Sequence, residues 1–430
     1  MNDARLDARP RRVLTGAAIV VALVARLGFA FGYWTDQPLT HDEREYLSLA
    51  ANLAQGRGFA PDLPGEPRPE RADTFDRAPL YPIVLAPLTW FDASLRDGRL
   101  PASVPAAIRF AQSLTGILVV LGAAALAARV GGERAGVVAA WLAALHPALT
   151  WIPAYALSEA VFVPLVIGAI AVVGRALDRP PAATPARTDL RDLAAGGVLT
   201  GLAVLARPST LVAVPLVALF LLGGRRVRPA LAFAAGVTLA IAPWAVPNSI
   251  AHGRVVVVSA QGGVNFWIGN HPEATGDGDL AANPQLKVAN LDLRMRHHDL
   301  TPVQLEPVYY REAFDWIRSE PVAWAGLLAR KAYYTVVPTG PSYRLHSPLY
   351  FWASVVPYLA LLPLAVAGVR AATASPAPPV ALGLFVLSSL VSSVLFFPHE
   401  RFRIAIVDPA LVVMAAVWLA RTREGVPDRR

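Results

Sequence analysis

A group of charged residues follows the first long apolar run directly, in the stretch "PLTHDEREYLSLAANLAQG" (38–56). Thr40 with Glu43 three residues later forms a capping box, which predicts the start of a helix. Asp42, Tyr46 and Leu49 then share one face of that helix. A carboxylate at this position can remove a proton from a bound hydroxyl group, as a general base does. It can equally serve only to complement the positive end of the helix dipole, and this stretch alone leaves both interpretations open.

Arginine residues stand in turns at the same predicted membrane face. Arg77 lies in "FDRAPLYP", Arg207 in the short turn "LARPST", and Arg401 with Arg403 in "FPHERFRIAI". Guanidinium groups bind phosphate through a planar fork of donors, so several of them at one face indicate a phosphate-bearing ligand. The alternative is that each arginine only contacts lipid headgroups. Glu159 in "AYALSEAVF" is either a second functional carboxylate or an ordinary acid at a helix start.

The composition shows which kind of element must hold these side chains. The chain has 430 residues, of which 55% are hydrophobic and only 16% are charged, with a mean hydropathy of +0.44. Because soluble domains carry about 25% charged residues, an integral membrane protein is predicted. The net charge of +8 comes from arginine in loops between apolar runs, which indicates membrane topology and not nucleic-acid binding. Cysteine is absent from the sequence, which excludes disulfides and thiolate metal sites.

Apolar runs of helical length predict an all-α polytopic membrane protein with about ten transmembrane helices. The runs cover residues 13–33, 105–129, 135–151, 155–175, 193–206, 208–224, 229–250, 349–369, 378–397 and 404–420. With this number of spans, the arginine-rich connections and both arginine-rich termini fall on one side, which the positive-inside rule makes cytoplasmic. Arginine in place of lysine, with much alanine and proline, indicates a bacterium. We therefore expect the plasma (inner) membrane, with the active site facing the periplasm.

Two long segments fall on the outer side. The first, 34–104, contains the charged helix and "APLYPIVLAPLTWF" (78–91), which is too short to span and is predicted to lie in the membrane interface. The second, 251–348, is predicted to be small and mixed, with a strand at "RVVVVSA" (254–260), a Gly/Asn-rich turn and an amphipathic helix at 302–319. The predicted divisions are an N-terminal transmembrane module (1–250), the outer segment (251–348) and C-terminal transmembrane helices (349–430).

Several stretches, taken in order, make the sequence resemble the GT-C glycosyltransferases that use polyprenyl-phosphate sugars. Among these enzymes it resembles the bacterial relatives of protein O-mannosyltransferase and the lipid A aminoarabinose transferase. The stretches are "DEREY", "RAPLYP", "LSE", "GGVLTGLAVLARPSTL", "GGVNFWIGNHPEATG", "REAFDWIRSEP" and "HERFRIAIVDPAL". The resemblance implies the GT-C fold and an inverting transfer of a sugar from polyprenyl phosphate to an acceptor hydroxyl on the outer membrane face.

The resemblance also implies roles for individual residues. Asp42 matches the general base, and Glu159 matches the acidic position that assists or orients the acceptor. The positions that match basic residues near the donor phosphate are Arg77, Arg401 and Arg403, with Arg207 placed beside them. The expected substrate pocket includes Glu43, Tyr46, Tyr81, Asn265 and His399. The implied partners are the lipid-linked sugar donor, membrane lipid, and an acceptor that is a glycan, a lipid or a protein.

No cofactor is predicted. A divalent metal is compatible with the histidines of the outer segments but is not indicated, because His297 and His298 are adjacent and not one helical turn apart. A secondary transporter or a lipid-linked-sugar flippase is the rival function, and it would place ionisable residues near span midpoints. Here the charges gather at one face, and Arg26 lies in the outer half of its run. A non-catalytic scaffold does not explain arginine in tight outer turns.

Overall fold

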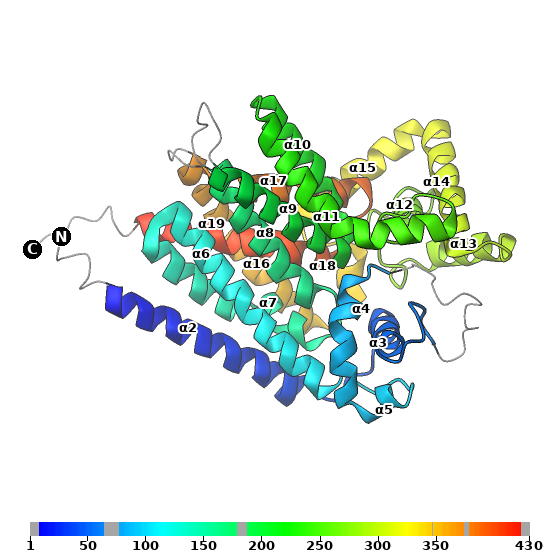
Figure 1. Cartoon of the computed structure of the whole chain (residues 1–430), viewed down its shortest axis with the longest axis horizontal. Helices are drawn as coiled ribbons and strands as arrows, with labels where there is room; N and C mark the ends of the chain where they lie inside the picture. Colours follow the sequence, from blue (N-terminus) through cyan, green and yellow to red (C-terminus); the bar gives the residue numbers. More distant parts are fainter. Residues whose placement is uncertain (1–7, 64–76, 179–186, 346, 374–377, 423–430) are drawn as a thin grey trace, which may run out of the picture.

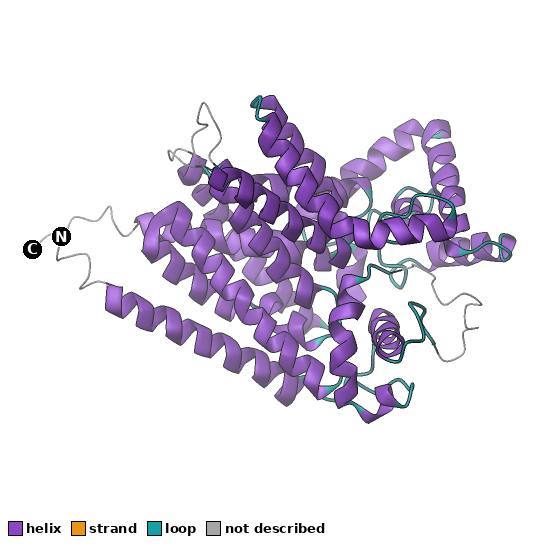
Figure 2. Ribbon diagram, viewed as in Figure 1, coloured by secondary structure: helices purple, strands orange, loops and turns teal. Residues whose placement is uncertain are grey.

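The computed structural model is a bundle of long helices with shorter helices gathered at one end (Figure 1). It describes residues 8–63, 77–178, 187–345, 347–373 and 378–422. Within these ranges every regular element is a helix and no strand occurs, as Figure 2 shows. The start of α2 and the end of α19 lie at one end of the bundle, and α3 to α5 with α12 to α15 lie at the other.

The long helices confirm the predicted all-α, multi-pass membrane architecture. They are α2 (Ala8–Gly28), α6 (Ala106–Leu145), α8 (Glu159–Leu177), α9 (Arg187–Ala206), α10 (Ala213–Gly223), α11 (Val227–His252), α16 (Pro348–Thr373), α17 (Val380–Leu395) and α19 (Asp408–Thr422). Six helical segments of the described chain are long and apolar enough to cross a membrane, and three further apolar helices are shorter. Most residues of every apolar run fall on these helices, and the remainder lie mainly on short helical pieces beside them.

Helix α6 contains two of the predicted runs. Its 40 residues would make a straight helix of about 60 Å, about twice the thickness of the bilayer core. Gly132 has φ 82°, in the left-handed region that strains other residues. The chain reverses here, because a Cβ atom on Gly136 would lie 2.9 Å from the Cβ of Ala128, whereas a straight helix separates such positions by about 12 Å. Two packed helical halves therefore replace one long rod.

Helix α3 (His41–Ala54) begins at the predicted capping box. The Thr40 hydroxyl accepts a hydrogen bond from the Glu43 backbone N–H, and Glu43 Oε2 accepts one from the Thr40 N–H at 2.8 Å. The other Glu43 oxygen accepts from the Ala156 N–H at 3.0 Å, which ties the start of α3 to the segment before α8. Helix α4 (Leu80–Leu85) and the 3-10 turn η2 (Ala86–Phe91) form the predicted interfacial piece beside α3.

The segment 251–348, predicted to lie outside the membrane, has only helices as regular elements among its described residues, so its predicted mixed character is wrong. It contains α12 (Gly262–Gly269), α13 (Pro284–Arg296), α14 (Pro302–Ser319), α15 (Pro321–Val336) and η5 (Pro341–Leu345). Helix α14 has the predicted bounds, but α12 occupies the stretch expected to be a Gly/Asn-rich turn.

The strand predicted at 254–260 does not form. Two of its backbone groups bond to side chains of α11 instead of to a partner strand. The Val256 N–H donates to the Ser249 hydroxyl at 3.0 Å, and the Val258 carbonyl accepts from the Trp244 indole at 2.8 Å.

Candidate active site

An ion-pair cluster forms where α3, the start of α8, the turn before the 3-10 helix η4 (Pro208–Val212) and the short helix α18 (Glu400–Phe402) come together. Its members are Asp42, Glu45, Arg77, Glu159, Arg207 and Arg401. Five of them are predicted site residues that lie far apart in the sequence. The fold therefore brings the predicted general base, the second acid and three of the four predicted phosphate-binding arginines into one contiguous group.

Asp42 is held by two guanidinium groups. Its Oδ1 accepts from Arg77 Nη2 at 2.7 Å and its Oδ2 accepts from Arg401 Nη1 at 2.6 Å. Arg77 also donates through Nε to Glu45 at 2.6 Å, so it bridges two carboxylates of α3. The Asp42 side chain keeps 28% of its surface exposed, which leaves the carboxylate within reach of a substrate.

Glu159 is the buried centre of the cluster. Its side chain has no exposed surface, and it accepts from Arg401 Nε at 2.5 Å and from Arg401 Nη2 at 3.1 Å. Arg207 forms a further ion pair with the same carboxylate, and its guanidinium lies 4.6 Å from the ring centroid of Phe402. Arg401 therefore uses separate nitrogens to join Glu159 to Asp42.

The charges of the cluster balance, because three carboxylates meet three guanidinium groups. Burial alone would raise the pKa of Asp42, but the charges and hydrogen bonds of Arg77 and Arg401 outweigh burial and hold that pKa well below its usual range. For Arg77, burial opposes the charged form, yet Asp42, Tyr46 and Glu45 together raise its pKa. With no ligand bound, Asp42 is therefore fully ionised and weakly basic.

Three of the residues predicted for the substrate pocket are buried next to the cluster. Glu43 is buried, with one oxygen in the cap of α3 and the other accepting from the Ala156 N–H. The Tyr46 ring lies 5.3 Å from the Arg77 guanidinium and meets Tyr81 edge-on at 4.9 Å. Tyr81 is buried, and its hydroxyl donates to Gln112 at 2.6 Å.

The structure separates Arg403 from Arg401, although both are predicted to face the donor phosphate. Arg403 begins the π-helical turn η6 (Arg403–Val407) and is buried. It donates to the Tyr343 hydroxyl at 3.2 Å and to the Ser354 hydroxyl at 2.8 Å, and its Nε lies 3.0 Å from Asp408 Oδ1. Its contacts are thus with α16, α19 and η5.

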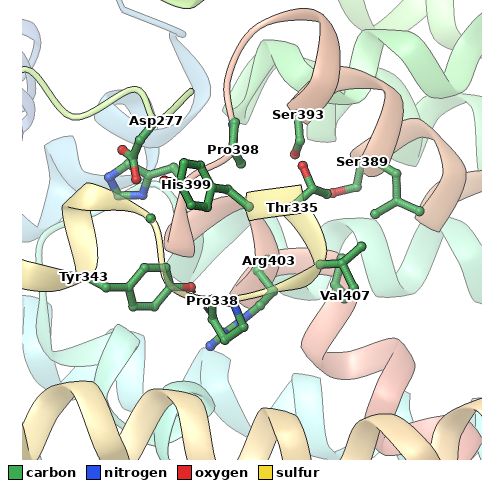
Figure 3. Close-up of a pocket in the computed structure, with 14 residues that line it drawn as sticks. Asp277, Thr335, Pro338, Tyr343, Ser389, Ser393, Pro398, His399, Arg403 and Val407 are labelled. Atoms are coloured by element: carbon green, nitrogen blue, oxygen red, sulfur yellow. Dashed lines mark hydrogen bonds between the residues drawn. The ribbon is translucent and has the colours of Figure 1, made fainter. Parts of the chain in front are cut away.

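Arg403 and the predicted pocket residue His399 line a separate pocket, shown in Figure 3. The His399 Nδ1 accepts from the Arg401 N–H at 3.2 Å, so this imidazole caps the turn that carries Arg401. Asn265, also predicted for the substrate pocket, lies on α12 in the outer segment. Among the described residues, no hydrogen bond joins its side chain to the ion-pair cluster.

Glu45 is the member of the cluster that the sequence prediction missed. A usable signal existed, because residues three apart on a helix are neighbours and Asp42 and Glu45 have that spacing. Across the part of the chain that the structure describes, no group of three or more His, Asp or Glu side chains is arranged to hold a metal ion.

The fold defines the class: a multi-pass membrane protein with the all-helical architecture that the resemblance to GT-C glycosyltransferases predicts. The predicted resemblance is confirmed by a family model. The model of the dolichyl-phosphate-mannose-protein mannosyltransferase family matches residues 99–250. No curated protein matches the chain.

Solved structures of an archaeal oligosaccharyltransferase share the fold at low sequence identity. The oligosaccharyltransferase of Archaeoglobus fulgidus, in a complex with zinc and sulfate, is 15% identical with a TM-score of 0.56 over 96% of this chain and 49% of that chain. The same archaeal enzyme, AglB, in complex with an inhibitory peptide and a dolichol-phosphate, is 14% identical with a TM-score of 0.54 over 98% of this chain and 52% of that chain. The present chain thus spans about half the length of these relatives. ArnT from Cupriavidus metallidurans, bound to undecaprenyl phosphate, is 15% identical with a TM-score of 0.41 over 96% of this chain and 78% of that chain.

Proposed function

We propose that the chain is an integral-membrane inverting glycosyltransferase that moves a hexosyl or pentosyl group from a polyprenyl-phosphate donor to an acceptor hydroxyl. The observation that carries this proposal is the direct contact of a partly exposed carboxylate, Asp42, with the guanidinium of Arg401. One group can take a proton while the other holds a phosphate. The dolichol-phosphate in the complex of the archaeal oligosaccharyltransferase supports a lipid phosphate as the donor anchor.

In the proposed reaction, Asp42 takes the proton of the acceptor hydroxyl. The acceptor oxygen forms a bond to the anomeric carbon from the face opposite the phosphate, so the configuration inverts. The bond from that carbon to the phosphate oxygen breaks, and its electron pair stays on the lipid phosphate. Fixed guanidinium groups stabilise this growing negative charge, since preorganised donors aimed at a developing charge are a large catalytic term.

The ion pairs also suggest how the base becomes active. In the unliganded cluster, Arg77 and Arg401 suppress the basicity of Asp42. A donor phosphate that accepts from Arg401 Nη1 in place of Asp42 removes one of these hydrogen bonds, and the lost contact together with the added negative charge raises the pKa of Asp42. Arg401 keeps Glu159 as its second partner and need not leave its place. The proposal is therefore an ordered reaction in which the donor binds before the acceptor is deprotonated.

The proposed location is the inner membrane of a bacterium, with both termini cytoplasmic and the cluster facing the periplasm. The arginine distribution supports this orientation. The start of α2 and the end of α19 also lie at the end of the bundle opposite α3 (Figure 1). The acceptor is a glycan, a lipid or a protein of the cell envelope.

The test uses purified protein with radiolabelled polyprenyl-phosphate sugars and a cell-envelope fraction as acceptor. We expect the wild type to move label from the lipid to the acceptor fraction, and the Asp42→Asn variant to leave it on the lipid. The proposal is wrong if no donor is consumed while the labelled lipid-linked sugar crosses the membrane of vesicles that contain the wild type. That result would identify the protein as a flippase.

A further inference from the structure

A short connection joins α17 to α18, the helix that carries Arg401. It consists of residues 396–399, so only a few residues separate Arg401 from Leu395, the last residue of α17. The position of that helix end therefore limits where the Arg401 guanidinium can reach. Because this guanidinium bridges two acids of the cluster, Asp42 and Glu159, the connection has to be held in one place.

The connection between α12 and α13, residues 270–283, lies against the start of the α17–α18 connection. Asn270 donates through Nδ2 to the carbonyl of Leu395 at 2.9 Å. The carbonyl of Phe396 occupies the space that a Cβ atom on Gly269 would need. Glycine at this position therefore lets the two backbones meet directly. This contact accounts for the "GN" pair in a stretch of the sequence to which the proposed reaction gives no role.

The same α12–α13 connection contacts the far end of the α17–α18 connection. The ring of Phe397 packs against Gly278. The Asp279 carboxylate lies 3.9 Å from His399 Nε2, and Nδ1 of that imidazole accepts from the Arg401 N–H at 3.2 Å. With a proton on Nε2, His399 directs that N–H toward Asp279 and still accepts from Arg401. The contacts thus extend from the end of α17 to the backbone of Arg401.

Lys331 of α15 holds the end of α17 from a second side. Its Nζ donates to Asn270 Oδ1 at 3.0 Å. It also donates to the carbonyls of Val394 and Leu395 at 3.2 Å and 3.4 Å. These carbonyls belong to the last turn of α17, where intrahelical donors are missing and the helix dipole favours a cation. Trp324, two turns earlier on the same face of α15, donates to the same Asn270 oxygen at 2.9 Å.

Lys331 is an unfavourable residue to bury at this position. It has no exposed surface, and its three described acceptors are neutral amide oxygens with no carboxylate among them. An apolar side chain of similar length would fill the space without burying a charge. Folding stability therefore does not explain the lysine. What it supplies is a set of charge-assisted hydrogen bonds that fixes the end of α17.

We propose that Lys331, Asn270 and Asp279 are positioning residues for Arg401. They act through the end of α17 and the α17–α18 connection, and they do not touch the substrate. The proposal rests on the proposed function, since the donor phosphate is what Arg401 would bind. Loss of Lys331 weakens donor binding without removing any group of the ion-pair cluster.

The test replaces Lys331 by methionine, which has a similar length and no charge. Lys287→Met is the matched control, because Lys287 is the only other lysine of the sequence and is exposed on α13. Binding of a labelled polyprenyl-phosphate sugar to solubilised protein is measured, and a thermal melt shows whether each variant is folded. We expect the dissociation constant to rise about two- to tenfold for Lys331→Met and to stay unchanged for Lys287→Met.

A double-mutant cycle with Arg401→Gln separates positioning from general stability. If Lys331 acts through Arg401, Lys331→Met causes no further loss of donor binding once Arg401 is replaced. An equal loss in both backgrounds overturns the proposal, and so does a Lys331→Met variant that binds donor as the wild type does. If Lys331→Met does not fold, Asp279→Asn takes its place in the same cycle with the same outcomes, because it changes the contact to His399 and keeps the shape of the side chain.

Failure of the proposed function gives a different result. A wild type that transfers no label overturns the proposed function, whereas the binding cycle needs no turnover. If the wild type also binds no donor, hydrogen–deuterium exchange at residues 396–402 tests the positioning by itself. We expect exchange there to be faster in Lys331→Met than in the wild type and in Lys287→Met. Equal exchange in all three proteins overturns the proposal.

Discussion

The Asp42→Asn substitution separates base catalysis from electrostatics, because Asn keeps the shape of the side chain and removes its charge. Arg77 keeps Glu45 as a partner, and Arg401 keeps Glu159. The arginines should therefore stay in place. The cluster changes from neutral to a net charge of about +1, which favours binding of a phosphate anion. The lost proton acceptor should lower kcat by about 10²–10⁴-fold, which corresponds to about 3–5 kcal/mol of activation free energy.

Glu45→Gln is the control for the charge. It adds the same positive charge and removes one partner of Arg77, but it leaves Asp42 ionised beside Arg401. Single-turnover kinetics with a labelled donor would measure the chemical step, and binding of the donor to detergent-solubilised protein would be measured in parallel. We expect both variants to bind donor at least as tightly as the wild type, with the large fall in rate confined to Asp42→Asn. Equal rates for the two variants, or loss of donor binding in Asp42→Asn, would refute the assignment of Asp42 as the base.

Three further substitutions test other parts of the structure. Arg403→Met leaves a fully buried carboxylate of α19 without its guanidinium partner and should lower the free energy of unfolding by about 3–5 kcal/mol, so an unchanged thermal melt would contradict its structural role. Burial lowers the pKa of Lys331 to about 7, so the folded state binds fewer protons than the unfolded state above that pH. Stability should thus rise from pH 7 to pH 10 in the wild type but not in Lys331→Met, as denaturant titrations would show. Gly269→Ala puts a Cβ atom 1.8 Å from the Phe396 carbonyl oxygen, so the chain that leads to α18 must shift. We expect this variant to transfer label at least tenfold more slowly than the wild type. Gly326→Ala is the control, because a Cβ atom there meets nothing within 4 Å, and it should match the wild type in the same assay.

Local signals predicted the long apolar helices, the start of α3 and the bounds of α14. The start of α3 was predictable because Thr40 and Glu43 are close in the chain and satisfy each other's backbone groups. The valine-rich stretch at 254–260 gave a wrong strand prediction. Valine is frequent in strands because its side chain packs well on a half-buried surface, and this is not a preference of the backbone for the strand conformation. Val256 and Val258 are buried here as an irregular segment whose backbone bonds to side chains of α11.

Long-range pairing was harder to predict. The sequence does not show that Arg401 contacts Asp42 and not another acid. Several Asp and Glu residues lie in the predicted outer segments, and only the fold decides which of them is near each arginine. The different directions of the Arg401 and Arg403 side chains were easier to predict, since residues two apart on a helix do not face the same way. Their partners, Glu159 for one and Asp408 for the other, became evident only from the packing.

The ion pair between Asp42 and Arg401 has a consequence for how the protein is made. The two residues are 359 positions apart in the chain. After Asp42 has left the ribosome, nearly all the membrane helices must therefore be synthesised before Arg401 leaves it. Until then, Glu159 can pair with Arg207 but not with Arg401, its second guanidinium partner. A chain whose synthesis stops before α18 carries an incomplete cluster, so assembly of the site depends on insertion of the last helical segment.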